Sequence, residues 1–237
     1  MDYRKPHEFK DYWSPSRRTV YPQFVAESEI LSRPEIQRIL DFGCAAGWNM
    51  SRFVYYGRRP VGFDVALDRV SLARRFGPVL LASGVEIPVE DRVFDLVYVQ
   101  HVLHHMKDAP RALREMRRCL KPEGTLLLVE TAEDNPFIRW GRRLHPKWLG
   151  DPVLSFFTFE SLQELVRGAG FRITRSGAFS VMFWTWEMFP NRFPALERLT
   201  PAFAAAERWL QRHFGRYSAH CFVVAEPRTE RNNAVVP

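Results

Sequence analysis

Short apolar runs alternate with segments of helical spacing through the middle of the chain. The runs predict five strands, near 38–42, 60–64, 79–82, 94–100 and 124–130. Between them, apolar residues recur at helical spacing and predict helices near 48–56, 66–76 and 109–120. Alternation of strand and helix favours βαβ units, and therefore an α/β fold with a doubly wound, mostly parallel sheet.

The pattern continues beyond residue 157 and completes a seven-stranded sheet. Thr158 is placed to cap a helix that runs to about Ala169, and a strand follows over 170–174. The last strand is expected over 218–225. Two strands added to the five before them make seven.

A further helix is predicted to begin at Thr200 and Pro201, a polar cap followed by proline at the first helical position. Its expected apolar face consists of Phe203, Ala206, Leu210 and Phe214.

The elements fit one α/β domain over 36–226, since single domains of this class reach that size. Residues 1–35 mix aromatic and charged side chains with prolines and predict a helical extension, whose aromatics we expect to pack onto the core. Two stretches, 131–157 and 180–216, interrupt the alternation and are expected to form a lid over the substrate. Residues 227–237 are predicted to be a C-terminal tail.

The most informative segment is the turn after the first predicted strand, Ile39–Gly47, together with Asp64 at the end of the second. An apolar strand that breaks into small residues and then a helix brings backbone N–H groups close to a ligand. An acidic residue about 20 positions later is placed to grip ribose hydroxyls. The segment therefore predicts a nucleoside-bearing cofactor.

The turn also bears on which cofactor binds. A dinucleotide fingerprint needs glycine at three places, and here those places hold Gly43, Ala45 and Trp48. The methyl and the indole argue against NAD or FAD, and no Gly-Lys-Ser/Thr follows to make a P-loop. A nucleoside without a pyrophosphate, such as S-adenosylmethionine, still fits.

Five motifs, in order along the chain, carry a resemblance to a known family. They are Leu40–Gly47, Val61–Asp64, Phe94–Val97, Val102–Met106 and Leu120–Leu126. With them the chain resembles the class I S-adenosylmethionine-dependent methyltransferases, in particular those that act on small molecules. The resemblance implies a Rossmann-like seven-stranded sheet and S-adenosylmethionine as cofactor.

The resemblance also assigns cofactor-binding residues. They are Asp41, Gly43, Cys44, Ala45, Gly47, Asp64, Val65, Ser83, Gly84, Val85, Gln100 and His101. The turn is expected to face the amino-acid part of the cofactor and Asp64 its ribose, although Asp64 would also serve as a helix N-cap. Ser83 stands where the family usually has an aspartate for the adenine amino group, and Ala45 where glycine is commoner.

Histidines follow the fourth strand, at the end of the sheet where ligands bind. His105 is our first candidate for a general base and His104 the second, because histidine titrates near neutrality. In the alternative interpretation this segment packs on the cofactor without transferring a proton. We expect no metal, since neither a carboxylate nor a cysteine stands at ligand spacing from these histidines.

Charge and composition narrow the partners. Lys and Arg number 34 against 27 Asp and Glu, a formal charge of +7 that suits an anionic partner. The three cysteines show no CxxC pairing and are expected to be buried thiols in a reducing compartment. The polar N-terminus and the lack of a long apolar run predict a cytoplasmic protein.

Aromatic residues in the variable parts are the expected substrate contacts, unless they serve only as core. They are Tyr12, Trp13, Phe183, Trp184 and Trp186. Basic residues near 139–147 are placed to meet anionic headgroups in a peripheral membrane contact.

The sequence thus predicts methyl transfer to an oxygen or carbon of a small lipophilic metabolite. The alternatives are an RNA or protein methyltransferase, a non-catalytic binding protein of the same fold and, disfavoured by Trp48, an NAD-linked oxidoreductase. Nucleic-acid base methylation is disfavoured as well, because residues 100–103 lack the Pro-Pro motif of those enzymes.

Overall fold

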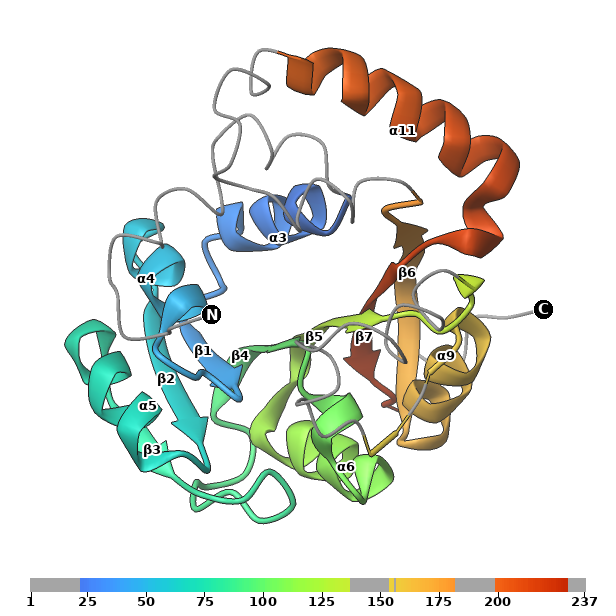
Figure 1. Ribbon diagram of the computed structural model, residues 1–237. Coiled ribbons are helices and arrows are strands. Elements are labelled where there is room, and N and C mark those ends of the chain that lie inside the picture. The colour runs from blue at the N-terminus through green and yellow to red at the C-terminus, as the bar shows by residue number, and fades with distance from the viewer. Residues whose placement is uncertain (1–21, 137–153, 156, 182–198, 230–237) are drawn as a thin grey trace.

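The computed structural model describes residues 22–136, 154–155, 157–181 and 199–229 of the 237-residue chain. A seven-stranded sheet forms its centre, in the order β3-β2-β1-β4-β5-β7-β6 (Figure 1). The strands are β1 (Arg38–Phe42), β2 (Arg59–Asp64), β3 (Val79–Leu81), β4 (Phe94–Gln100), β5 (Leu120–Thr131), β6 (Phe171–Phe179) and β7 (His220–Pro227). The α-helices of the described residues are α3 (Pro22–Ser32), α4 (Trp48–Tyr55), α5 (Leu67–Ala73), α6 (Ala109–Cys119), α9 (Phe159–Gly168) and α11 (Thr200–Phe214).

Strand direction confirms the predicted mostly parallel sheet. Strands β1 to β5 pair parallel to one another. Strand β7 pairs antiparallel with both β5 and β6, so it is the one reversed strand of the seven. The carboxyl ends of the other six strands therefore share one edge with the start of β7.

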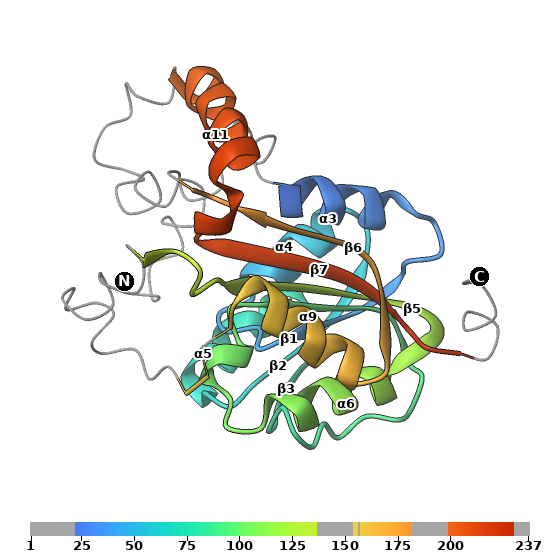
Figure 2. The ribbon, with the colours of Figure 1, turned by 90° about the vertical axis from the view of Figure 1, so that its right-hand side faces the viewer.

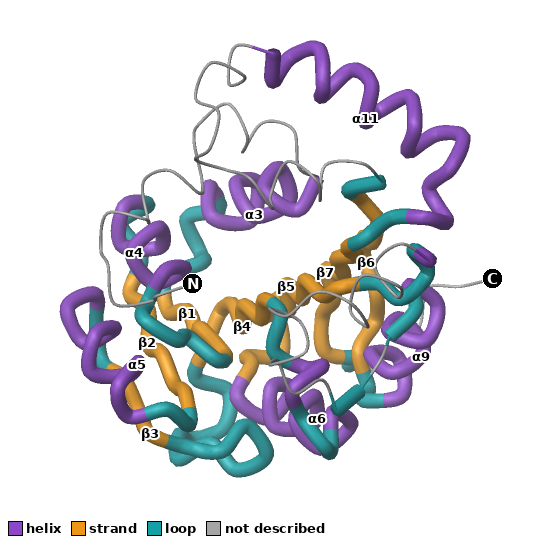
Figure 3. Tube along the Cα trace, viewed as in Figure 1, coloured by secondary structure: helices purple, strands orange, loops and turns teal. Residues whose placement is uncertain are grey.

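Helices cover both faces of the sheet, as a doubly wound fold requires (Figures 1 and 3). On one face, Phe24 and Leu31 of α3 and Phe53 of α4 pack with Leu96 and Leu127 of the sheet. On the other face, α6 and α9 bury their apolar stripes against neighbouring positions of the same strands. Burial of Phe24 also confirms that an aromatic of the N-terminal extension packs onto the core.

Several predicted boundaries differ from the structure: β6 runs to Phe179 and β7 over His220–Pro227, beyond the ends predicted at 174 and 225. Helix α5 ends at Ala73, and a 3₁₀ turn, η1 (Arg74–Phe76), completes the segment expected as one helix. Strand β5 begins at Leu120, before the expected start at 124, because Leu120 already pairs with Phe94. The register shifts before Thr125, and such an irregularity is where a strand accommodates a proline like Pro122.

The apolar face predicted for α11 is wrong in part. Ala206 and Phe214 are exposed, whereas the buried positions among the side chains that the structure describes are Ala204 and Glu207; the side chain of Phe203 lies outside them. A hydrogen bond accounts for the burial of Glu207, because its carboxylate accepts from the backbone N–H of Val181, just after β6. With that anchor on the inner side, larger apolar side chains turn outward, and α11 stands away from the sheet (Figure 2).

Candidate functional site

The carboxyl ends of β1, β2 and β4 meet where the strand order reverses, which is where doubly wound sheets bind their ligands. The segments that follow these strands touch. A Cβ atom on Gly43 would lie 2.6 Å from a methyl carbon of Val102, and the N–H of Cys44 donates to the carbonyl of Phe63 at 2.8 Å. Residues 43–47, 64–66 and 101–105 thus lie together at this edge of the sheet, and we call this place the crevice because doubly wound sheets bind their ligands here.

The turn after β1 has a left-handed backbone at three positions. Gly43, Ala45 and Gly47 all have positive φ angles, of 75°, 45° and 84°. Because Ala45 has a side chain, a positive φ angle strains its backbone, and strained backbones are common at ligand-binding turns. Cys44, predicted as a buried thiol, is buried, and burial raises the pKa of its thiol.

Helix α4 starts directly after the turn. Its N-cap is Gly47, which has no side chain to cap the helix. The first N–H groups of such a helix carry a partial positive charge and bind carboxylates. A side chain at Gly47 would collide with Phe76 and Ala73, at 2.8 and 3.0 Å, so the helix start is fixed by close packing.

Asp41 lies beneath the turn and is fully buried. Its Oδ1 accepts a hydrogen bond from Asn49 Nδ2 at 3.2 Å, while its Oδ2 has no partner among the described residues. Burial raises the pKa of Asp41 to about 7, against the lowering effects of the Asn49 hydrogen bond and the Arg52 charge. A buried acceptor in this state suits a cationic ligand group such as an ammonium.

Asp64 ends β2 at the same edge and is half-buried. Its Oδ2 accepts from the N–H of Ala45 at 3.0 Å and its Oδ1 from the N–H of Ala66 at 2.9 Å. The N-cap of α5 is Ala66, so Asp64 does not occupy the alternative helix-cap position. The carboxylate instead ties the first turn to the second, and Val65 beside it is 73% exposed.

The segment after β3 packs against residues at the same edge of the sheet. Ser83 is exposed, and its hydroxyl accepts a hydrogen bond from the N–H of Val85 at 3.4 Å. Gly84 is buried, and a Cβ there would lie 2.7 Å from Phe42 and 2.8 Å from Met106. This close packing explains the glycine, and the adenine contact of Ser83 stays a prediction.

At the end of β4, Gln100 and His101 turn the chain into the histidine segment. Gln100 Oε1 accepts a hydrogen bond from the Tyr98 hydroxyl at 3.2 Å. His101 has a φ angle of 55° and donates its backbone N–H to the carbonyl of Val129 at 2.9 Å. The short helix η2 (Leu103–His105) follows.

A buried glutamate that the sequence analysis missed organises this segment. Glu130 of β5 accepts the N–H groups of Val102 and Leu103 at Oε1, at 2.9 and 2.7 Å, and its Oε2 lies 2.7 Å from His104 Nδ1. Although burial alone would raise the pKa of Glu130, its bonds and the histidine charges hold it below the usual value. His104 is buried and His105 exposed.

Glu130 adds to the histidines a carboxylate that does not stand at ligand spacing from them in the sequence. Glu130 comes from the neighbouring strand, so its link with His104 is invisible in local spacing. Its place at the end of the strand predicted over 124–130, beside the end of 94–100, was the available signal. The described residues nevertheless hold no group of three or more His, Cys, Asp or Glu side chains arranged to bind a metal.

The predicted substrate contacts lie outside the described residues. They are Tyr12, Trp13, Phe183, Trp184 and Trp186, together with the basic residues at 139–147.

Comparison with known proteins identifies the family. A family model described as a methyltransferase domain matches residues 13–176, more than half of the chain. The chain belongs to this methyltransferase family. It is a member of class I, the S-adenosylmethionine-dependent methyltransferases, as the motifs of the crevice indicated.

Individual relatives are more distant. An uncharacterized methyltransferase, YcgJ of Bacillus subtilis, is 32% identical over 104 residues, which cover 39% of this chain and 40% of YcgJ. The O-methyltransferase resE of Aspergillus sclerotiorum is 29% identical over 157 residues, covering 60% of this chain and 58% of resE. The chain therefore matches less than two thirds of the length of either relative.

Solved structures show the same fold. A S-adenosylmethionine-dependent methyltransferase from Archaeoglobus fulgidus superimposes with a TM-score of 0.65 at 16% identity, covering 95% of this chain and all of that one (100%). The seven-stranded α/β fold of the methyltransferases is thus confirmed.

The residues of the crevice fit the cofactor of this class. The unpartnered oxygen of Asp41 matches the ammonium of S-adenosylmethionine, and the uncapped start of α4 matches its carboxylate. Asp64 at the end of β2 accepts a hydrogen bond from Ala45 of the turn, so one ligand of nucleoside size can reach both Asp64 and the turn.

Proposed function

We propose that this methyltransferase transfers a methyl group from S-adenosylmethionine to an oxygen or carbon of a small lipophilic metabolite. The observation that carries the proposal is the buried pair of Glu130 and His104 beside the crevice. Oxygen and carbon acceptors lose a proton as they are methylated, and a carboxylate-bound imidazole is suited to receive it. The O-methyltransferase activity in the name of resE supports the same class of acceptor.

Three groups of this chain would hold the cofactor. Asp41 binds its ammonium, the start of α4 its carboxylate and Asp64 its ribose. When bound, S-adenosylmethionine supplies an electrophilic methyl group on a positively charged sulfur. The protein then has to align the acceptor with that methyl group and exclude water.

Within the histidine segment we assign the proton transfer to His104. Glu130 fixes one ring nitrogen of His104, which leaves the other nitrogen as the base. His105 is exposed, and its ring centroid lies 4.0 Å from that of His104, so its contacts suit a supporting role.

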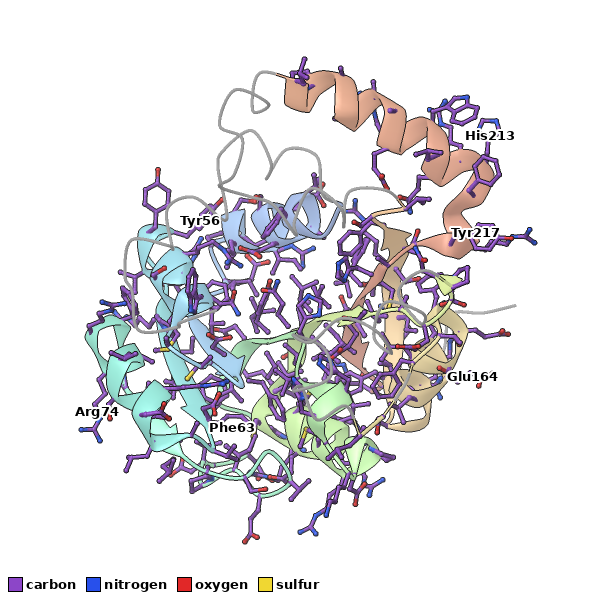
Figure 4. All side chains as sticks on the ribbon, in the orientation of Figure 1. Tyr56, Phe63, Arg74, Glu164, His213 and Tyr217 are labelled. Carbon is purple, nitrogen blue, oxygen red and sulfur yellow. The ribbon has the colours of Figure 1, made fainter. Side chains whose placement is uncertain are left out.

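A lipophilic acceptor agrees with an unusual surface on α11. Leu199, Ala202, Ala206, Trp209 and His213 recur at helical spacing on its exposed side, and Trp209 is 56% exposed. His213 lies on the outer side of the helix (Figure 4). We call this row, with exposed Phe214, the outer face of α11.

Charge complements this outer face. The exposed arginines of the same end of α11 and of η4 (Gly215–Tyr217) are Arg208, Arg212 and Arg216. Exposed aromatics bordered by arginines favour contact with an anionic membrane surface. Because η4 leads directly into β7, which starts at the crevice edge, a membrane contact here would bring lipophilic acceptors to the site. None of the described helices has both the length and the apolar character needed to cross a bilayer.

The acceptor class is tested by incubating the protein with trideuteromethyl-labelled S-adenosylmethionine and fractionated cell extracts. We expect the label in phenols, quinones, fatty acids or isoprenoids, detected by mass spectrometry as the mass gain of one trideuteromethyl group. Label found only in RNA or in protein would replace this proposal by the corresponding alternative. No label in any fraction, with intact cofactor binding, would favour a non-catalytic binding protein.

A further inference from the structure

A buried chain of polar side chains runs from the N-terminal helix to the crevice. Arg52 of α4 donates Nε and Nη2 to the carboxylate oxygens of Glu27 of α3, at 2.9 and 2.8 Å. The same Nη2 donates to the Tyr98 hydroxyl at 3.3 Å, and Tyr98 donates to Gln100 at 3.2 Å. Both side chains of the ion pair are only 4% exposed.

The chain of contacts lies against Asp41. In the parallel pairing of β1 with β4, Asp41 is the register partner of Tyr98, so their side chains lie side by side on one face of the sheet. That is the face covered by α3 and α4. The Arg52 charge also acts on the Asp41 carboxyl group. The polar chain therefore borders the end of the crevice where the amino-acid part of the cofactor is expected.

Packing alone does not explain an ion pair at this place. Removing two charges from water costs several kcal/mol per ion, and apolar side chains of similar volume often stabilise a core equally well. The surroundings are suited to apolar groups, since the Arg52 guanidinium lies over the rings of Phe24 and Tyr98, at 5.4 and 5.9 Å from their centroids. A role at the neighbouring site accounts for the charges.

The charge of the cofactor suggests that role. S-adenosylmethionine carries two positive groups, the ammonium and the sulfonium, and one carboxylate. An uncompensated arginine beside its pocket would repel it, whereas Arg52 paired with Glu27 is neutral as a pair. The product, S-adenosylhomocysteine, has lost the sulfonium charge and would feel less repulsion.

We infer that Glu27, Arg52 and Tyr98 are positioning residues of the cofactor pocket, through which helix α3 sets the affinity and the charge preference of the site. Glu27 neutralises Arg52, and Arg52 orients Tyr98, which in turn holds Gln100 at the end of β4. The inference rests on S-adenosylmethionine as cofactor and is independent of the acceptor proposed above.

The charge role is tested with Glu27→Gln, by titration calorimetry of both S-adenosylmethionine and S-adenosylhomocysteine. We expect the variant to bind S-adenosylmethionine more weakly. The ratio of the dissociation constant of S-adenosylmethionine to that of S-adenosylhomocysteine should rise by about threefold to tenfold, the effect of one unit charge acting at short range in a protein. The double variant Glu27→Met with Arg52→Met removes both charges, and its ratio should return to within about twofold of the wild type.

The geometric role is tested with Tyr98→Phe, which keeps the ring and removes the hydroxyl. Both ligands should bind more weakly, by about threefold or more, with their ratio unchanged, because the link to Gln100 is lost without a change of charge. Glu226→Gln is the matched control: it neutralises a carboxylate 2.7 Å from Arg172 at the far edge of the sheet and should alter neither affinity.

Two results would overturn the inference. In the first, Glu27→Gln lowers the melting temperature but changes both affinities equally or leaves them unchanged, which would make the ion pair purely structural. In the second, Tyr98→Phe binds both ligands as the wild type does. If Glu27→Gln does not fold, the charge-free double variant and Tyr98→Phe decide. If neither of them loses affinity, a positioning role is excluded.

Discussion

Burial at the crevice edge shifts the pKa of a single residue, Asp41. Asp41 is fully buried, one of its oxygens has no partner within the described part of the chain, and burial raises its pKa to about 7. The free protein therefore holds a proton on Asp41 below that pH. An incoming ammonium favours the ionised carboxylate, so cofactor binding near neutrality should release a proton.

The pH dependence of binding follows from this shift. As the pH falls below about 7, affinity for S-adenosylmethionine should drop by up to tenfold per pH unit, because the carboxyl group must be deprotonated at increasing cost. Calorimetry between pH 5.5 and 8, in buffers of different ionisation heat, measures both the affinity and the proton release. Asp41→Asn should bind weakly with a flatter profile. An identical pH profile in that variant would remove Asp41 from the site.

The histidine pair is tested by removing one ring at a time. His104→Gln should lower kcat on the identified acceptor by about a hundredfold or more, the range for loss of a general base, with cofactor affinity preserved. His105→Gln is the control and should change kcat little. Full activity in His104→Gln would leave the histidine segment with a packing role only.

Asp64 joins two turns, and we propose that it also binds the ribose of the cofactor. Asp64→Ala should weaken S-adenosylmethionine binding by about 1–3 kcal/mol, the scale for losing a charged hydrogen-bond partner. Asp64→Asn keeps an acceptor for the N–H of Ala45 and should lose less. Unchanged affinity in Asp64→Ala, measured by calorimetry, would rule out the ribose contact.

Among site residues, local pattern was enough to predict some and not others. Gly43, Gly47 and Asp64 were predicted because a strand, a turn and a following acid are adjacent in sequence. Glu130 and Arg52 were missed, since each acts through a partner far away in the chain, His104 and Glu27 respectively. Such pairs appear only when strands and helices are placed in space.

At the scale of elements, the turn between β1 and α4 depends on a close approach to the histidine segment. Gly43 and Gly57 both have left-handed backbones, with φ angles of 75° and 71°, but only Gly43 lacks space for a side chain. Gly57→Ala should cost about 1 kcal/mol of stability from backbone strain alone. Gly43→Ala should cost more and weaken cofactor binding, since its methyl would meet Val102 at 2.6 Å.

Adding Val102→Ala to Gly43→Ala separates the two effects. Relief of the collision should recover part of the lost stability in thermal unfolding and leave the strain. Equal destabilisation by Gly43→Ala and Gly57→Ala would show that the turn does not pack as described.

Helix α11 is the element whose environment the sequence pattern misjudged. Periodicity identified the helix but not which side faces the protein, because a buried Glu207 and an exposed Trp209 reverse the usual order. If its outer face meets membranes, Trp209→Ser with Phe214→Ser should reduce sedimentation with anionic phosphatidylglycerol vesicles severalfold, with little effect on neutral vesicles. Tyr55→Ser is the control, since Tyr55 is 84% exposed on α4. Equal vesicle binding by all variants would remove the membrane contact.

At the scale of the whole molecule, the sequence pattern predicted seven strands, their mostly parallel arrangement and the doubly wound class. Strand and helix alternation determines these features through short-range connections. The position of β7 between β5 and β6 depends on long-range antiparallel pairing, as between Val129 and Phe222, which no local pattern reports. The predicted insertions follow β5 and β6 and so begin at the crevice edge, while the lid itself stays a prediction.

The central claim is that the crevice at the ends of β1 and β2 binds S-adenosylmethionine. Titration of the full-length protein with S-adenosylmethionine and, in parallel, with NAD tests it most directly. The account predicts saturable binding of S-adenosylmethionine at one site per chain, weakened in Asp41→Asn and Asp64→Ala, and no binding of NAD. No heat with S-adenosylmethionine, or binding that neither variant alters, would contradict it.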